Sequence, residues 1–126
     1  MEKPHKKLEA WKLSMELVID VYRTTDGFPN QEKYGLTDQI RRATISVPSN
    51  IAEGAARQTK KEFTNYLHIA QGSLSELDTQ IELARQLGYL EDKTWRILDE
   101  RMERIDKLIS GLIHHLNLKE RVRREK

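Results

Sequence analysis

Apolar residues recur at alternating steps of three and four along most of the chain, which is the spacing of one face of an α-helix. Interruptions of this period divide the chain into four predicted helices, at about residues 8–26, 35–57, 60–88 and 92–118. The period is lost after residue 118, so we expect residues 119–126 to form a frayed tail. The apolar positions of the four helices are, in order, Leu8, Trp11, Met15, Val18 and Tyr22; Leu36, Ile40, Ala43, Val47 and Ile51; Phe63, Leu67, Ala70, Leu74, Leu77, Ile81 and Ala84; and Leu98, Met102, Ile105, Ile109, Leu112 and Leu116.

Local signals mark where the helices begin and end. Gly27 can adopt a positive φ and Pro29 cannot continue a helix, so the first helix is predicted to end just before them. Thr59 and Glu62 have the spacing of a capping box, which predicts the start of the third helix. Pro48 lies inside the second period. Because the period continues in phase across it, we expect a kink there and not a break.

Four helices joined by short connections are most simply arranged with antiparallel neighbours. We therefore predict one all-α domain over residues 1–126, an antiparallel up-down-up-down four-helix bundle, and find no run typical of a strand. The length suffices for a packed core without disulfides or metals. Gly72 and Gly111 lie inside the third and fourth predicted helices, at comparable distances from the turn near Leu90, and are predicted to allow close packing of those helices.

The first helix carries a second apolar row, Leu13, Leu17 and Val21, nearly opposite to the first row. A helix of a monomeric bundle needs only one buried face, so we predict that another copy of the chain covers this second row. The alternative is that the first helix is embedded more deeply in its own bundle than a simple helical wheel implies. We therefore expect a homo-oligomer with these three residues at its interface.

Composition narrows the class of protein. The chain has no cysteine, which excludes disulfides and thiolate metal sites. Its first residues contain no apolar signal segment, and no stretch approaches the ~18 apolar residues that a membrane span requires. We therefore expect a cytoplasmic protein that does not enter a membrane.

Charge is distributed unevenly, although the net charge is only +2. Residues 62–92 hold six acidic residues and one base, whereas residues 119–126 hold five bases and two acids. Three basic groups are predicted to contact the phosphates of RNA or DNA with little sequence readout, and a solvated face is the alternative for each. The groups are Arg41 and Arg42; Arg57, Lys60 and Lys61; and Arg121, Arg123, Arg124 and Lys126.

No motif for catalysis or metal binding is found. Helix bundles that hold two metal ions use Glu-x-x-His motifs, but His68, His114 and His115 lack a glutamate three residues earlier. The one Glu-x-x-His, Glu2 to His5, lies in the N-terminal segment, which we expect to be flexible. No Gly-rich phosphate loop, nucleophile elbow or Cys–His pair is present. We therefore expect no enzymatic activity, no cofactor and no metal. Asn50 and Glu53 are predicted to make structural hydrogen bonds, with a ligand-binding role as the alternative.

Several stretches of the chain resemble a known family. Residues 46–54, Ser-Val-Pro-Ser-Asn-Ile-Ala-Glu-Gly, together with residues 34–43 and 72–77, closely resemble the proteins encoded in intervening sequences of bacterial 23S ribosomal RNA, also labelled S23 ribosomal proteins. The resemblance spans nearly the whole chain. It implies a four-helix bundle that assembles as a pentameric ring. It also implies kinship with the accessory variability determinant of diversity-generating retroelements, a relative that resembles a basic pentamer binding nucleic acid and a reverse transcriptase.

The residues and the resemblance together favour a non-enzymatic homo-oligomeric accessory protein, pentameric by resemblance, that contacts the backbone of RNA or DNA through its basic groups. The alternative function is a protein-interaction scaffold, for example for a reverse transcriptase, that does not bind nucleic acid. Neither function requires a small-molecule substrate.

Overall fold

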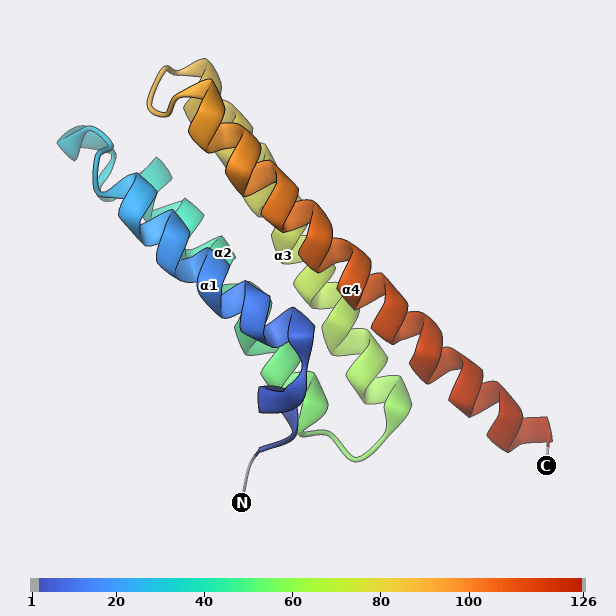
Figure 1. Ribbon diagram of the computed structural model, residues 1–126. Coiled ribbons are helices and arrows are strands. Elements are labelled where there is room, and N and C mark those ends of the chain that lie inside the picture. The colour runs from blue at the N-terminus through green and yellow to red at the C-terminus, as the bar shows by residue number, and fades with distance from the viewer. Residues whose placement is uncertain (1–2, 126) are drawn as a thin grey trace.

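The computed structural model describes residues 3–125, and the side chains of residues 3–123. Within these residues the chain forms the helices α1 (Glu9–Thr25), α2 (Leu36–Ala55), α3 (Lys60–Gln86) and α4 (Asp92–Glu125), with short 3₁₀ helices η1 (Pro4–Lys7) and η2 (Asn30–Glu32). Each α-helix contacts the next, and α4 contacts α1, so the four helices close an antiparallel bundle (Figure 1). The predicted fold class is confirmed.

The observed helices agree with the predicted ranges to within two residues, except at the end of α4. There the helix continues to Glu125, through the segment that we predicted to be frayed. Two properties of the segment explain the difference. Its Lys, Arg and Glu residues have high helix propensity, and basic side chains stabilise the negative end of a helix dipole. Loss of the apolar period therefore did not mean loss of the helix.

The ends of α3 are set by local hydrogen bonds. The Thr59 hydroxyl accepts a hydrogen bond from the Glu62 amide at 3.1 Å, which confirms the predicted helix start. At the other end Gly88 adopts a φ of 80°, and the Tyr89 amide donates to the Ala84 carbonyl at 2.9 Å. This is the Schellman arrangement, in which a glycine without Cβ strain reverses the chain.

Two other local predictions had different outcomes. Gly27 does not adopt a positive φ, because the chain leaves α1 through ordinary helical turns in which the Phe28 amide donates to the Thr25 carbonyl at 3.1 Å. The prediction for Gly27 was therefore wrong. Helix α2 continues through Pro48 without a break, as predicted.

The core confirms the predicted faces of α2, α3 and α4 but reverses those of α1. Leu17 is 1% exposed and Val21 is fully buried, while Leu13 is partly buried against the same core. The prediction that this row faces another subunit was therefore wrong. Of the row that we predicted for the core, Met15 is 42% exposed, whereas Leu8 and Trp11 are only partly buried where they pack against the core. Both rows have the same period, so periodicity alone could not rank them.

Small residues explain why α1 turns the Leu17 row inward. Ala10 and Ser14 are buried on the same side of α1 as Leu17 and Val21. The Ser14 hydroxyl donates to the Ala10 carbonyl at 2.6 Å, so its polar group is satisfied inside the helix. This side of α1 can therefore approach its neighbours without a bulky or unsatisfied group.

A glycine allows α2 and α3 to pack closely where they meet at the α2–α3 turn. A Cβ atom at Gly54 would lie 2.7 Å from the Cβ atom of Tyr66, which is too close for two carbon atoms. Gly72 and Gly111, by contrast, face open space, and a Cβ at either position would meet nothing within 4 Å. The prediction that these two glycines serve close packing was wrong.

Substitution of these glycines should therefore have opposite effects. Gly54→Ala should lower the free energy of unfolding by about 1–3 kcal/mol, because the added methyl overpacks the contact with Tyr66. Gly72→Ala should raise it by roughly 0.5–1 kcal/mol, because alanine favours a helix interior and nothing obstructs it. Urea unfolding followed by circular dichroism measures both changes. A Gly54→Ala variant as stable as the parent would contradict the close packing.

Candidate nucleic-acid interface

The antiparallel bundle separates the charges of the chain into two halves. The basic half contains the start of α1 with η1, the end of α2, the start of α3 and the end of α4, which are residues 3–19, 45–75 and 108–123. It holds ten Lys and Arg residues and five Asp and Glu residues. The acidic half consists of residues 20–44 and 76–107. It holds ten Lys and Arg residues and thirteen Asp and Glu residues. The small net charge therefore hides a strong asymmetry along the bundle.

Lys60 lies where two of the predicted basic groups meet. A first hollow of about 460 Å³ lies between Lys60 and the end of α4, where Lys119 and Arg123 also line it. A second hollow of about 300 Å³ contains Lys60 and Lys61 together with Arg121. The structure thus joins the basic residues of the α2–α3 turn and of the C-terminal segment into one surface. The side chain of Arg124, and all of Lys126, lie outside the described residues.

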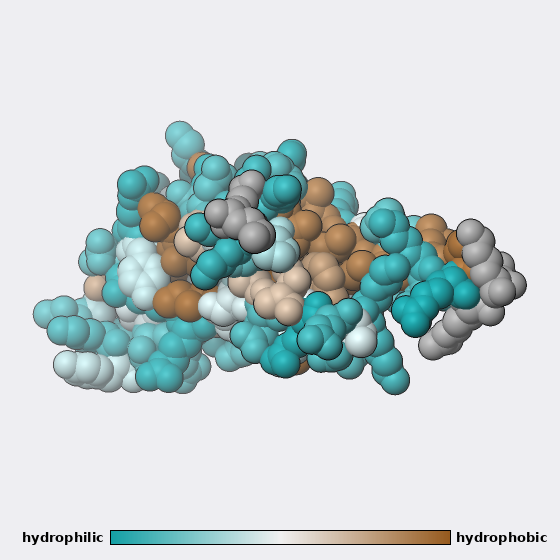
Figure 2. Space-filling view, turned by 90° about the horizontal axis from the view of Figure 1, so that it is seen from below, coloured by the Kyte–Doolittle hydropathy of each residue, from teal (hydrophilic) through white to brown (hydrophobic). Residues whose placement is uncertain are grey.

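Figure 2 views the molecule from the side of this basic half and shows brown hydrophobic surface among the teal hydrophilic side chains. Helix η1, which contacts both α1 and α2, adds Lys6 and Lys7 to the same half. The His5 ring packs against Trp11 with their centroids 4.9 Å apart, so the segment is folded against the bundle. The predicted basic groups did not include these two lysines, although they are adjacent in the sequence.

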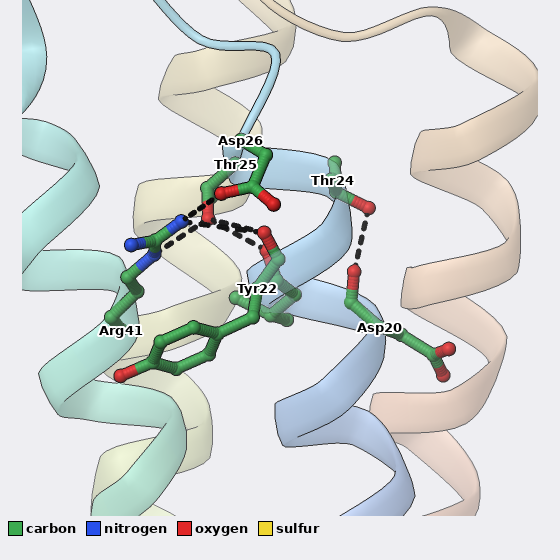
Figure 3. Close-up of polar contacts among 7 residues, drawn as sticks. Asp20, Tyr22, Thr24, Thr25, Asp26 and Arg41 are labelled. Atoms are coloured by element: carbon green, nitrogen blue, oxygen red, sulfur yellow. Dashed lines mark hydrogen bonds and ion pairs between the residues drawn. The ribbon is translucent and has the colours of Figure 1, made fainter.

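Arg41 does not belong to the basic surface. Its guanidinium donates to the Thr25 hydroxyl at 2.9 Å and to the Asp26 carboxylate at 3.0 Å (Figure 3). It also lies over the Tyr22 ring, 4.4 Å from the centroid. Because these contacts tie α2 to the end of α1, Arg41 is a structural residue and not an open phosphate contact.

The two other predicted arginines that precede α3, Arg42 and Arg57, each pair with an acid one helical turn away. Arg42 lies in the acidic half and donates to Asp38 at 3.0 Å. Arg57 lies in the basic half, where it donates to the Glu53 carboxylate at 2.7 Å and to the Tyr66 hydroxyl at 2.6 Å. Tyr66 and Glu53 raise the pKa of Arg57. Of the predicted basic residues, the structure brings four together on the two hollows: Lys60, Lys61, Arg121 and Arg123.

The acidic half contains a hollow that is lined by several carboxylates. It lies between α3 and α4, has a volume of about 480 Å³ and is lined by Asp78, Asp99, Glu103 and Asp106 among others. Burial, and the negative charges of Asp99 and Glu82, raise the pKa of Asp78. These carboxylates give the acidic half a local charge opposite in sign to that of the basic half.

An apolar groove lies between α1 and α2 on the outside of the bundle. It has a volume of about 310 Å³, and its lining is apolar except for Ser49. Ile45 is 42% exposed there, like Met15 on the facing helix. The remaining lining residues are Trp11, Val18, Pro48 and Ala52. The exposed apolar surface between α1 and α2 is therefore this groove and not the Leu17 row.

The remaining candidate residues do not form a catalytic or metal-binding site in the part of the chain that the structure describes. Asn50 donates to the Ser46 carbonyl at 2.8 Å, and the Ser46 hydroxyl lies 2.8 Å from that of Ser73, so Asn50 belongs to a polar contact between α2 and α3. Among the described residues, no three His, Asp or Glu side chains are placed to hold a metal ion. In the same part of the chain, no helix has the length and apolarity needed to cross a bilayer.

Comparisons with known proteins agree with the fold. The sequence model of the 23S rRNA-intervening sequence proteins matches residues 6–111. Among solved structures, the chain is similar to a protein of unknown function from the S23 ribosomal protein family of Bacteroides thetaiotaomicron, with a TM-score of 0.74 and 23% identity over 82% of this chain and 97% of the other. No curated protein matches. Since the family match covers most of the sequence, from before α1 into the middle of α4, the chain belongs to the family of 23S rRNA-intervening sequence proteins.

Proposed function

We propose that this chain is a non-enzymatic, homo-oligomeric accessory protein that binds the backbone of RNA or DNA through its basic half. The observation that carries the proposal is the convergence of Lys60 and Lys61 with Lys119, Arg121 and Arg123 on one surface. These five cations come from segments almost sixty residues apart in sequence. Phosphate contacts of such side chains add, and each releases counterions from the nucleic acid.

The acidic half makes the proposed binding directional. It presents carboxylates at the opposite end of α3 and α4, and these would repel phosphates. Lysine side chains dominate the basic half and contact phosphate without a fixed fork geometry, so the binding is expected to depend on backbone charge and not on base sequence.

Oligomerisation is the second part of the proposal. The groove between α1 and α2 exposes Met15 and Ile45 side by side with half-buried Trp11, an apolar surface of the kind that subunits bury. We propose that a second copy covers this groove and that the ring is a pentamer, as the resemblance implies. A ring would repeat the basic surface on every subunit and multiply the phosphate contacts.

A second candidate function is a protein-interaction scaffold, for example for a reverse transcriptase. The same apolar groove favours it, because it could seat a different protein instead of a second copy. A pull-down after nuclease treatment separates the two functions. A partner that is lost with the nucleic acid supports binding to RNA or DNA, and a partner that is retained supports the scaffold.

The nucleic-acid interface is tested by removing charge from each half in turn. Lys60→Ala with Lys61→Ala should lower the affinity for duplex RNA about tenfold at low salt. Because two phosphate contacts are lost, the slope of the logarithm of the binding constant against the logarithm of the salt concentration should become less steep by roughly 1.8. The matched control, Lys93→Ala with Arg96→Ala, removes the same charge from the acidic half and should change neither quantity. Filter binding at several salt concentrations measures both. Equal losses in the two variants, or no retention of RNA or duplex DNA by the parent even at low salt, would contradict the proposal.

The oligomer interface is tested by placing aspartates in the groove between α1 and α2 and, in a separate variant, in the Leu17 row of α1. Met15→Asp with Ile45→Asp should lower the mass seen by light scattering while the helical circular dichroism persists, because both side chains are already exposed. Leu17→Asp should instead abolish the helical signal, because a buried unpaired carboxylate costs several kcal/mol, a large part of the stability of a domain. An unchanged mass in the double variant would show that the groove is not the interface.

A further inference from the structure

The last turns of α4 extend past the first turn of α3 (Figure 1). On this extension Leu118 and Val122 lie one helical turn apart, on the side that faces Lys60, and they line the first hollow. Leu118 is 43% exposed and Val122 is 51% exposed, so no other part of the chain covers them fully. The extension therefore presents an apolar strip at the edge of the basic half.

Cations surround this apolar strip. Lys60 stands on the α3 side of the hollow, while Lys119 and Arg123 belong to α4 itself. Among the side chains of residues 3–123, none that lines this hollow is acidic. The neighbouring second hollow, which shares Lys60, adds the uncharged side chains of Asn65 and Asn117, together with one carboxylate, Glu120. Positive charge around an apolar floor fits an occupant with anionic groups at its rim and a flat apolar centre.

We infer that the first hollow binds an unpaired nucleotide of a single-stranded nucleic acid, with its base against Leu118 and Val122 and its flanking phosphates near Lys60 and Arg123. The inference rests on the proposed function and names the form of nucleic acid that the surface prefers. A single strand exposes the faces of its bases, whereas a duplex keeps them stacked inside and offers only phosphates.

This feature is separate from what the family match covers. The match ends at residue 111, whereas His115, Leu118, Val122 and Arg123 all follow it. The hollow also uses apolar residues that a purely electrostatic interface does not need. A preference for unpaired nucleotides would therefore be a property of this C-terminal extension.

The test compares a single-stranded oligouridylate of about twelve nucleotides with a duplex RNA of the same length. The parent protein should bind the single strand more tightly at equal salt. Leu118→Ser with Val122→Ser removes the apolar floor and keeps every charge, so it should weaken single-strand binding about tenfold and leave duplex binding unchanged. The matched control, Leu83→Ser with Leu87→Ser, changes two exposed apolar residues at the same spacing in the acidic half. It should leave both affinities unchanged. Fluorescence anisotropy measures the affinities, and circular dichroism checks the fold.

Other outcomes would overturn the inference in distinguishable ways. Equal affinity of the parent for single strand and duplex, or a single-strand affinity that the Leu118 and Val122 changes do not alter, would refute the role of the apolar strip and leave the proposed backbone binding intact. A lower mass of that variant by light scattering would show that the strip packs against a second copy instead. If the parent binds neither RNA, the proposed function fails together with this inference.

Discussion

Helix α1 has two apolar rows and can bury only one of them, and this constraint determines what the bundle shows to its surroundings. Leu17 and Val21 enter the core, next to the small residues Ala10 and Ser14. The Arg41 guanidinium holds α1 in this rotation, because it donates to Thr25, which follows Val21 by one helical turn on the same side. The larger apolar side chains of the other row are thereby left beside α2, where they form the outer groove.

The separation of charge follows from topology more than from composition. In the sequence, the basic residues around Lys60 and those after residue 118 are far apart, and each group alone resembles an ordinary solvated surface. Antiparallel connection places the start of α3 beside the end of α4, so the two groups meet. The same connection collects the carboxylates of Asp78, Asp99 and Asp106 at the other end. A net charge of +2 therefore says little about how the surface acts on a polyanion within a Debye length of ~8 Å.

The sequence was sufficient to predict the number, approximate limits and packing order of the helices, because strong periodicity and local end signals such as Thr59 depend on neighbouring residues only. It was not sufficient where two solutions satisfied the same local rule. The choice between the rows of α1 depends on how closely small residues let neighbouring helices approach, which is a property of the assembled core. Likewise Arg41 and Lys60 cannot be told apart by their sequence, since both are basic. In the folded chain Arg41 donates hydrogen bonds to Thr25 and Asp26, whereas Lys60 lines an open hollow.

The unequal halves of the bundle give the molecule an electric dipole moment directed along its long axis. In the field of a polyanion such a body experiences a torque before any atoms touch, and it turns so that the start of α3 and the end of α4 lead. Orientation during diffusion raises the fraction of encounters that are productive, and added salt removes this advantage first because it shortens the range of the field.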